Sequence, residues 1–291
     1  MEDEYLTVKA RVWKASTRTT TEQLIERYIL QDLAARTLAS ITRKELQAHL
    51  DRHAEALRLS ASIVGHIRWQ LKAIFEMAEA DQLVVKSPAN GLVMPLCKEA
   101  PPERTITADD VLRSQMVLPI RERLIFRLAV CEGMRPGEVV ALQLGDLRDG
   151  ISQVSRRVYN GKIDTPKSKR SRRMVPATAT TLALFEQWRE LLLNQKAEAW
   201  LFPSETGLTP VWYTNVLDRS IRPALEKIGL GHATFQVLRR TWVTEFSAAE
   251  KDPAIRAQLA GHTVDVHENE YRQPDPAALR KAMKKLEKRL Q

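Results

Sequence analysis

The residues with the chemistry of a reactive site are concentrated between Gly231 and Gln273. Arg239 lies on a short apolar helical pattern, His262 follows a glycine, and Tyr271 comes nine residues later. A fixed guanidinium group binds phosphate oxygens, and a tyrosine hydroxyl becomes a nucleophile when neighbouring cations or a base lower its pKa from about 10. This spacing predicts a phosphate site with a nucleophile beside it.

A second arginine, Arg135, lies where one predicted helix ends and another begins. Gly133 is placed to end the first helix in a left-handed conformation, and Pro136 suits the first position of the next helix. The free N–H groups at a helix start favour an anion beside this guanidinium group. Glu138, one turn later, either orients Arg135 or only favours the helix N-terminus.

Residues 156–173 hold eight basic side chains and a single acid, Asp164. Asn160-Gly161 within this run is a strong β-hairpin signal. A hairpin with alternating basic side chains presents one face to a phosphate backbone, whereas the alternative is a solvated edge that discourages aggregation. The density of charge favours polyanion contact. The candidate polyanion-binding residues are Arg156, Arg157, Lys162, Lys169, Arg170, Arg172 and Arg173, and Lys167 is placed to act as a proton donor.

The first hundred residues read as an all-helical bundle. Residues 1–18 show no sustained period, and capping signals at Thr20, Thr42 and Ser60 or Ser62 then open three helices. Several prolines follow, which remove backbone donors and disfavour helix. They predict a linker at 96–105 that divides the chain into domains at 1–95 and 106–291.

The second domain is predicted to be mainly helical with one small antiparallel β-sheet. The whole chain is therefore a mainly α protein of two domains. The expected strands are 151–158, 162–166 and 172–176, and the expected helices are 119–132, 179–195, 210–228, 235–249, 253–260 and 277–290. The last of these is a basic tail helix with an apolar stripe. Thr107 is placed to cap one further helix, with Asp109 and Asp110 in its first turn, and Thr234 is placed to cap the helix at 235–249.

The composition is that of a soluble protein with a polyanionic partner. The net charge is +9 and the pI about 9.6, and residues 101–291 carry 31 Lys and Arg against 23 Asp and Glu. Simple solubility is the alternative reading. Cys97 and Cys131 give no disulfide or ligand framework, and no His/Cys spacing or acidic cluster indicates a metal site. No apolar run reaches membrane-spanning length, which fits a cytoplasmic protein.

The ordered set of motifs resembles the tyrosine recombinase (phage integrase) family. The set is Gly133-Met-Arg-Pro-Gly-Glu-Val139, a lysine in a basic hairpin, Leu238-Arg-Arg-Thr241, Ala260-Gly-His262, and a tyrosine nine residues later. The resemblance covers residues 105–291, and the bundle at 1–95 is similar in pattern to that family's core-binding domain. It implies a helical DNA-binding bundle joined to a mixed α/β catalytic domain of the tyrosine recombinase type.

The resemblance also implies residue roles. Arg135 and Arg239 resemble the two arginines that clamp the scissile phosphate, and Tyr271 resembles the nucleophile that forms a 3′-phosphotyrosyl link. Lys167 is similar to the general acid that protonates the leaving 5′ oxygen. Lys169 competes for this role, because the register of a hairpin is not fixed by one sequence.

Two further positions complete the set implied by the resemblance. His262 matches the position that holds the phosphate and the nucleophile. Gln236 departs from the family, which usually has histidine three residues before the second arginine. Glutamine donates a hydrogen bond but carries no charge and relays no proton, so we expect a slower enzyme rather than an inactive one.

The implied function is a site-specific DNA recombinase, an integrase of a phage or mobile element, acting without metal, ATP or cofactor. The implied partners are double-stranded DNA, a homotetramer formed on DNA from free monomers, and accessory DNA-bending proteins, in the bacterial cytoplasm or nucleoid. The alternatives are a type IB topoisomerase-like enzyme and a DNA-binding regulator with a decayed active site. Because such integrases often carry an N-terminal arm-binding domain, this chain either lacks that domain or is a fragment.

Overall fold

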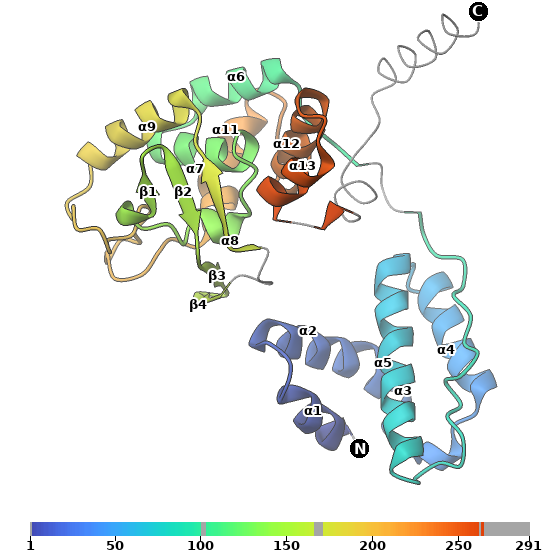
Figure 1. Cartoon of the computed structure of the whole chain (residues 1–291). Coiled ribbons are helices and arrows are strands. Elements are labelled where there is room, and N and C mark those ends of the chain that lie inside the picture. Colours follow the sequence, from blue (N-terminus) through green and yellow to red (C-terminus); the bar gives the residue numbers. More distant parts are fainter. Residues whose placement is uncertain (1, 100–102, 166–170, 262, 265–291) are drawn as a thin grey trace, which may run out of the picture. The chain divides into compact units, whose positions relative to one another are not determined.

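A computed structural model describes residues 2–99, 103–165, 171–261, 263 and 264 of the chain. The chain divides into two compact units, Met1–Pro102 and Glu103–Gln291, which are considered separately below (Figure 1). The predicted linker at 96–105 includes this boundary. In the described part of the chain, no helix is both long enough and apolar enough to cross a membrane.

The N-terminal unit is helical, as the sequence predicts. Its helices are α1 (Glu2–Ala10), α2 (Ala15–Ile25), a π-helical turn (Glu26–Leu30), α3 (Gln31–Leu33), a 3-10 turn (Leu38–Ser40), α4 (Arg43–Glu55) and α5 (Ala61–Ala80). The irregular start predicted for residues 1–18 is wrong, because α1 and the start of α2 occupy it. Thr20 opens no helix either; its hydroxyl donates to the carbonyl of Ser16 (2.9 Å) inside α2.

Two of the predicted helix starts in this unit are confirmed. Thr42 and Glu45 form a reciprocal capping box at the start of α4, and the Ser60 hydroxyl caps α5. The core buries apolar side chains of α2, α4 and α5, among them Ile25, Leu46 and Phe75. These local signals are therefore reinforced by a common apolar core.

Two histidines of α4 face the interior of this unit. His49 and His53 are 4% and 3% exposed, and their rings meet edge to face with centroids 4.3 Å apart. Burial lowers the pKa of His49 to about 4, and the neighbouring His53 acts in the same direction. His49 is therefore a neutral imidazole at neutral pH.

The C-terminal unit has the predicted mainly helical fold. Among its described residues the helices are α6 (Ala108–Val117), α7 (Ile120–Val130), α8 (Pro136–Val139), a 3-10 turn (Leu144–Asp146), α9 (Ala179–Glu190), α10 (Tyr213–Val216), a π-helical turn (Leu217–Ile221), α11 (Arg222–Glu226), α12 (Phe235–Ala249) and α13 (Pro253–Ala260). The α7 helix lies at the centre and packs against α9 and α12 (Figure 1). Its side chains from Leu124 to Val130 are all buried, and the one charged side chain among them, Arg127, donates to the Thr181 hydroxyl (3.0 Å).

The strands form two small sheets rather than the single one predicted. β1 (Leu147–Arg148), β2 (Ile151–Val154) and β5 (Arg173–Pro176) pair antiparallel in the order β1-β2-β5. β3 (Arg157–Tyr159) and β4 (Lys162–Asp164) form a separate hairpin. Asn160 and Gly161 turn this hairpin with φ of 46° and 71°, which confirms the predicted turn.

The start of the C-terminal unit is attached to α12. The main-chain nitrogen of Ile106 donates to Thr241 Oγ1 (3.0 Å), and Arg240 pairs with Glu103. Thr107 and Asp110 then form the predicted capping box of α6. The tail helix predicted at 277–290 lies outside the described residues.

Candidate functional site

Arg135 is held at the start of α8 by the sequence around it. Gly133 has φ of 63°, and a Cβ added there would lie 2.3 Å from Cδ2 of Trp242, so glycine is required both by conformation and by close packing. Pro136 follows in the first helical turn. Glu138 Oε2 accepts from the main-chain nitrogen of Arg135 and Glu138 Oε1 accepts from its Nη1, both at 3.0 Å. Both roles considered for Glu138 are therefore observed, because it orients the Arg135 side chain and also caps the start of α8.

Glu138 also binds a second arginine. Arg173 Nη2 donates to Glu138 Oε2 (3.0 Å), and Arg173 Nε donates to the carbonyl of Leu259 (2.7 Å). Burial by itself raises the pKa of Glu138, but the charges of Arg173 and Arg135 and their hydrogen bonds outweigh it, and the net pKa is lowered. Glu138 is therefore an ionised carboxylate that connects α8 to β5, and Arg173 extends this connection to the end of α13.

The buried position of Arg173 corrects one expectation. Arg173 was expected on the exposed basic face of the hairpin, but its side chain is 2% exposed. It pairs with Val154 on β2, and alternate residues of β5 are buried. Arg173 therefore supports the site from the interior and does not face solvent.

Arg239 reaches the same region from α12. Thr234 caps this helix, as predicted, and Arg239 is 5% exposed. Its Nη1 donates to the carbonyl of Gly133 and its Nη2 to the carbonyl of Ala260. Arg135 Nη2 donates to the next carbonyl, that of Gly261 (3.2 Å). Both arginines are thus anchored to the turn that ends α13.

The two arginines line one cavity of about 310 Å³ together with Gln236. Gln236 is exposed and lies one turn before Arg239 on α12. The other lining residues are Pro136, Gly137, Glu138, Arg157, Val158, Tyr159, Ser171, Tyr213 and Phe235. The structure therefore brings together all three of the predicted catalytic residues that it describes.

The remaining predicted catalytic residues, Lys167, His262 and Tyr271, lie outside the described residues. The same is true of Lys169 and Arg170. The structure places none of them.

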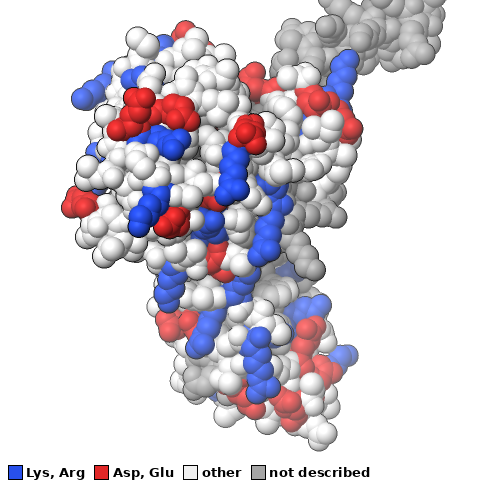
Figure 2. Space-filling model, turned by 60° about the vertical axis from the view of Figure 1, so that its left-hand side comes forward, with Lys and Arg blue, Asp and Glu red and all other residues white. Residues whose placement is uncertain are grey.

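The basic residues of the hairpin region differ in their surroundings. Arg156 pairs with Asp146 (3.1 Å), and Arg157 pairs with Asp164 (2.9 Å). Lys162 and Arg172 are exposed. On the face shown in Figure 2, basic and acidic side chains are interspersed. The charges of Arg156 and Arg157 are therefore partly balanced by acids. A polyanion that contacts this region would meet individual exposed cations and not a continuous basic surface.

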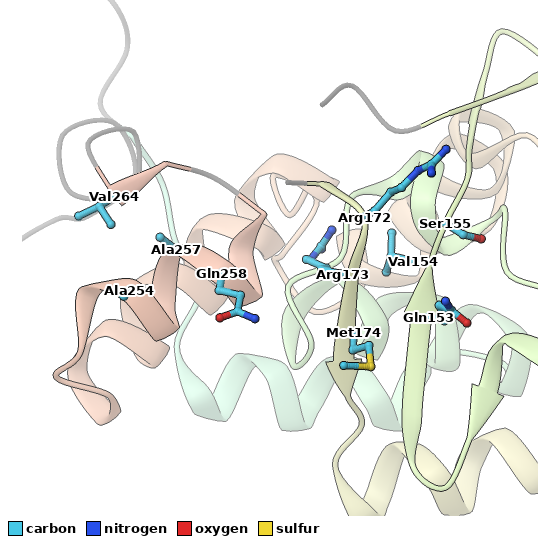
Figure 3. Close-up of a pocket in the computed structure, with 10 residues that line it drawn as sticks. All are labelled: Gln153, Val154, Ser155, Arg172, Arg173, Met174, Ala254, Ala257, Gln258 and Val264. Carbon is cyan, nitrogen blue, oxygen red and sulfur yellow. The ribbon is translucent and has the colours of Figure 1, made fainter. Parts of the chain in front are cut away.

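A larger cavity of about 790 Å³ lies between the β2–β5 pair and α13 (Figure 3). Its wall includes Arg172 and Met174 from β5 and Ala257 and Gln258 from α13. Despite its size, it lacks Arg135 and Arg239. The smaller cavity is the better anion site because two anchored guanidinium groups line it.

Sequence reasoning missed several residues of the smaller cavity. Tyr159, Ser171 and Tyr213 line it from three separate segments. No local motif marks them, because only the packing of α10 and the hairpin around α8 and α12 brings them together.

Comparisons with known proteins agree with this geometry. Residues 106–277 match the phage integrase family. The chain belongs to that family. A tyrosine recombinase XerC-like protein of Caldanaerobacter subterraneus is 24% identical over 228 residues, which are 66% of this chain and 57% of that protein. The ICEBs1 integrase of Bacillus subtilis is 24% identical over 178 residues, 57% of this chain and 47% of that protein. This chain thus matches about half the length of these curated relatives.

Two solved integrase structures share the fold of this phage integrase family member. The Tn1549 transposon integrase in complex with circular intermediate DNA has a TM-score of 0.76 and 18% identity, covering 96% of this chain and 98% of that one. A lambda integrase dimer bound to a COC′ core site has a TM-score of 0.71 and 22% identity, covering 93% of each chain. At these identities the likeness establishes the fold alone.

Proposed function

We propose that this phage integrase family member is a site-specific DNA recombinase that cuts and rejoins double-stranded DNA through a 3′-phosphotyrosyl intermediate. One observation carries the proposal. Arg135 and Arg239, separated by more than a hundred residues, line the same cavity and hydrogen-bond to the adjacent carbonyls of Gly261 and Ala260. Two such fixed cations suit a phosphate that gains negative charge in its transition state.

The proposed reaction begins with attack of the Tyr271 hydroxyl oxygen on phosphorus. The bond from phosphorus to the 5′ oxygen breaks, and that oxygen takes a proton from Lys167 or Lys169. Tyr271 releases its own proton to water as the phosphotyrosyl ester forms. Attack by a 5′-hydroxyl on this ester reverses the steps, so the energy of the broken bond is retained in the ester.

The described side chains have defined parts in this scheme. Arg135 and Arg239 hold the non-bridging phosphate oxygens, and Glu138 keeps Arg135 in place. Gln236, exposed on the cavity wall, donates a neutral hydrogen bond where the family usually has a charged or proton-relaying histidine. We assign residues 106–291 the catalytic role and residues 1–95 the role of a second DNA-binding domain, with a tetramer formed on DNA.

The test is covalent capture. The target site is first selected from random DNA, and the full chain is then incubated with a nicked suicide duplex of that site. A denaturing gel should show a protein–DNA adduct that Tyr271→Phe abolishes and that Tyr28→Phe, in the N-terminal unit, leaves unchanged. Specific binding without any adduct would instead indicate a regulator, and relaxation of plasmids lacking the site would indicate a topoisomerase.

A further inference from the structure

A cluster of metal-binding side chains lies in the N-terminal unit, whereas the phosphate site belongs to the C-terminal unit. His49 and His53 are one turn apart on α4, and Asp32 belongs to α3. One ligand atom from each of the three lies within 4.8 Å of the others. We propose that His49 and His53, supported by Asp32, bind a divalent transition-metal ion of the zinc class. No metal site was predicted from the sequence, although a spacing of four residues places two histidines on the same face of a helix.

The two imidazole rings bring one nitrogen atom of each close together. His49 Nε2 and His53 Nε2 are 3.1 Å apart. Two nitrogen ligands of a tetrahedral zinc ion, each about 2.0–2.1 Å from the metal, are separated by about 3.3 Å. The rings are nearly perpendicular, at 86°. A shift of a few tenths of an ångström in two side chains would therefore suffice for both to bind one ion.

Asp32 is placed to support His49 from the other side of the ring. Asp32 Oδ2 lies 3.2 Å from His49 Nδ1, the nitrogen that does not face His53. A carboxylate that accepts the Nδ1 proton leaves the Nε2 lone pair of the histidine available to a metal. This carboxylate–histidine arrangement is the usual support of a histidine ligand.

Binding also changes the hydrogen bonds of His53. In the metal-free chain, its Nε2 lies 2.9 Å from the main-chain oxygen of Tyr28, which accepts its proton. A metal at Nε2 moves that proton to Nδ1, which is buried and has no hydrogen-bond partner in the described part of the chain. This rearrangement opposes binding, so we expect a weaker site than a structural zinc site with four protein ligands.

Arg52 competes with the metal for the same groups. It pairs with Asp32, and its Nη2 lies 3.2 Å from His49 Nδ1. The guanidinium group thus contributes a positive charge beside the site, and Coulomb repulsion opposes a second cation there. The Arg52 side chain is 51% exposed, so it can move into solvent without disturbing the core. Its removal should strengthen metal binding.

The experiment is a calorimetric titration of the full chain with zinc chloride, repeated with cobalt chloride to record the visible spectrum of the bound ion. We expect one zinc ion at this cluster and no response to magnesium. His49→Gln and His53→Gln should each weaken binding at least 100-fold, and Asp32→Asn roughly 10- to 100-fold. Arg52→Gln should strengthen it severalfold. His66→Ala, an exposed histidine on α5, is the matched control and should change nothing.

The proposal is overturned if the wild-type chain binds no zinc, or if binding persists unchanged in both His49→Gln and His53→Gln. Circular dichroism without metal checks that the variants fold. Both histidine rings are buried, and their replacement can prevent folding. If the histidine variants do not fold, the zinc affinities of Asp32→Asn and Arg52→Gln test the proposal, because these substitutions alter exposed or half-exposed side chains. Weaker zinc binding in Asp32→Asn together with stronger binding in Arg52→Gln supports the site. Equal shifts in the two variants, or no shift in either, reject it.

Discussion

Arg135 and Arg239 donate hydrogen bonds to the carbonyls of two consecutive residues, Gly261 and Ala260. The two arginines come from segments far apart in the chain, yet the same short turn fixes both. Their relative position is therefore set before any ligand arrives.

Arg239 and its neighbour Arg240 should differ sharply in importance. Arg239 is buried at the cavity, whereas Arg240 pairs with Glu103 at the start of the unit. Arg239→Ala should lower the rate of adduct formation roughly 100- to 1,000-fold, since it removes a donor to the charged transition state. Arg240→Ala should lower it little. Equal rates for the two variants in the suicide-duplex assay would contradict the assigned site.

Glu138→Gln should destabilise the C-terminal unit. The substitution leaves the buried Arg173 without its counter-charge, which costs about 3–5 kcal/mol. Urea unfolding measures this loss. Glu186→Gln is the control, because Glu186 is 62% exposed and lies 3.6 Å from Arg189, a pair worth less than about 1 kcal/mol. Similar losses in both variants would show that Glu138 does not hold the arginines.

Gln236→His should accelerate DNA cleavage. The residue is exposed at the cavity, so histidine fits there without repacking, and a charge-assisted contact contributes about 1.5–3 kcal/mol. The rate should rise roughly ten- to a hundredfold in a single-turnover assay. Gln258→His, in the larger cavity, tests whether any added histidine has this effect. An unchanged rate in Gln236→His would mean that this position does not act in the transition state.

Gly133→Ala should be more damaging than Gly229→Ala. Both glycines have a positive φ, 63° and 80°, so each substitution costs roughly 1–2 kcal/mol of backbone strain. Only at Gly133 does the added Cβ meet another group, the Trp242 ring. The clash should add a further 1–3 kcal/mol, about as much as other cases of overpacking. Thermal or urea unfolding of both variants separates the cost of backbone strain from the cost of the clash. Equal losses of stability in the two variants would disprove the close contact between Gly133 and the Trp242 ring.

Glu132 should make stability depend on pH. Burial raises its pKa, outweighing its hydrogen bonds from Thr178 and the charge of Arg127. Because the folded pKa lies above the unfolded one, the stabilising contribution is complete below the ordinary carboxyl pKa and is lost as pH rises above it. Glu132→Gln removes this dependence. We expect the variant to become progressively more stable than the wild type when the unfolding free energies of both are measured from pH 5 to 8. A difference in unfolding free energy that stays constant over this range would refute the raised pKa of Glu132.

The sequence predicted the local features well, because each depends on backbone chemistry within a few residues. The capping boxes at Thr42 and Thr107, the left-handed Gly133 and the Asn160-Gly161 turn are all confirmed. The mainly helical fold with a small amount of antiparallel β-structure is also confirmed, although the strands form two sheets and not one. Arg135, Gln236 and Arg239 were predicted from the order of the motifs, and they do meet at one cavity.

Features that depend on long-range packing were not predicted. The burial of Arg173 follows from the pairing of β5 with β2 and from Glu138, neither of which a run of basic residues reveals. The separation of the strands into two sheets depends on a break after Val154, within a segment that reads as one continuous strand. The meeting of His49 and His53 with Asp32 required the fold of the N-terminal unit.

The attachment of the first residues of the C-terminal unit to α12 has a mechanical consequence. Glu103 and Ile106 bind Arg240 and Thr241, which directly follow Arg239 on that helix. A pulling force on the chain that enters this unit is therefore transmitted to α12 before it reaches α6, the next helix in the sequence. The same α12 presents a guanidinium group to the cavity.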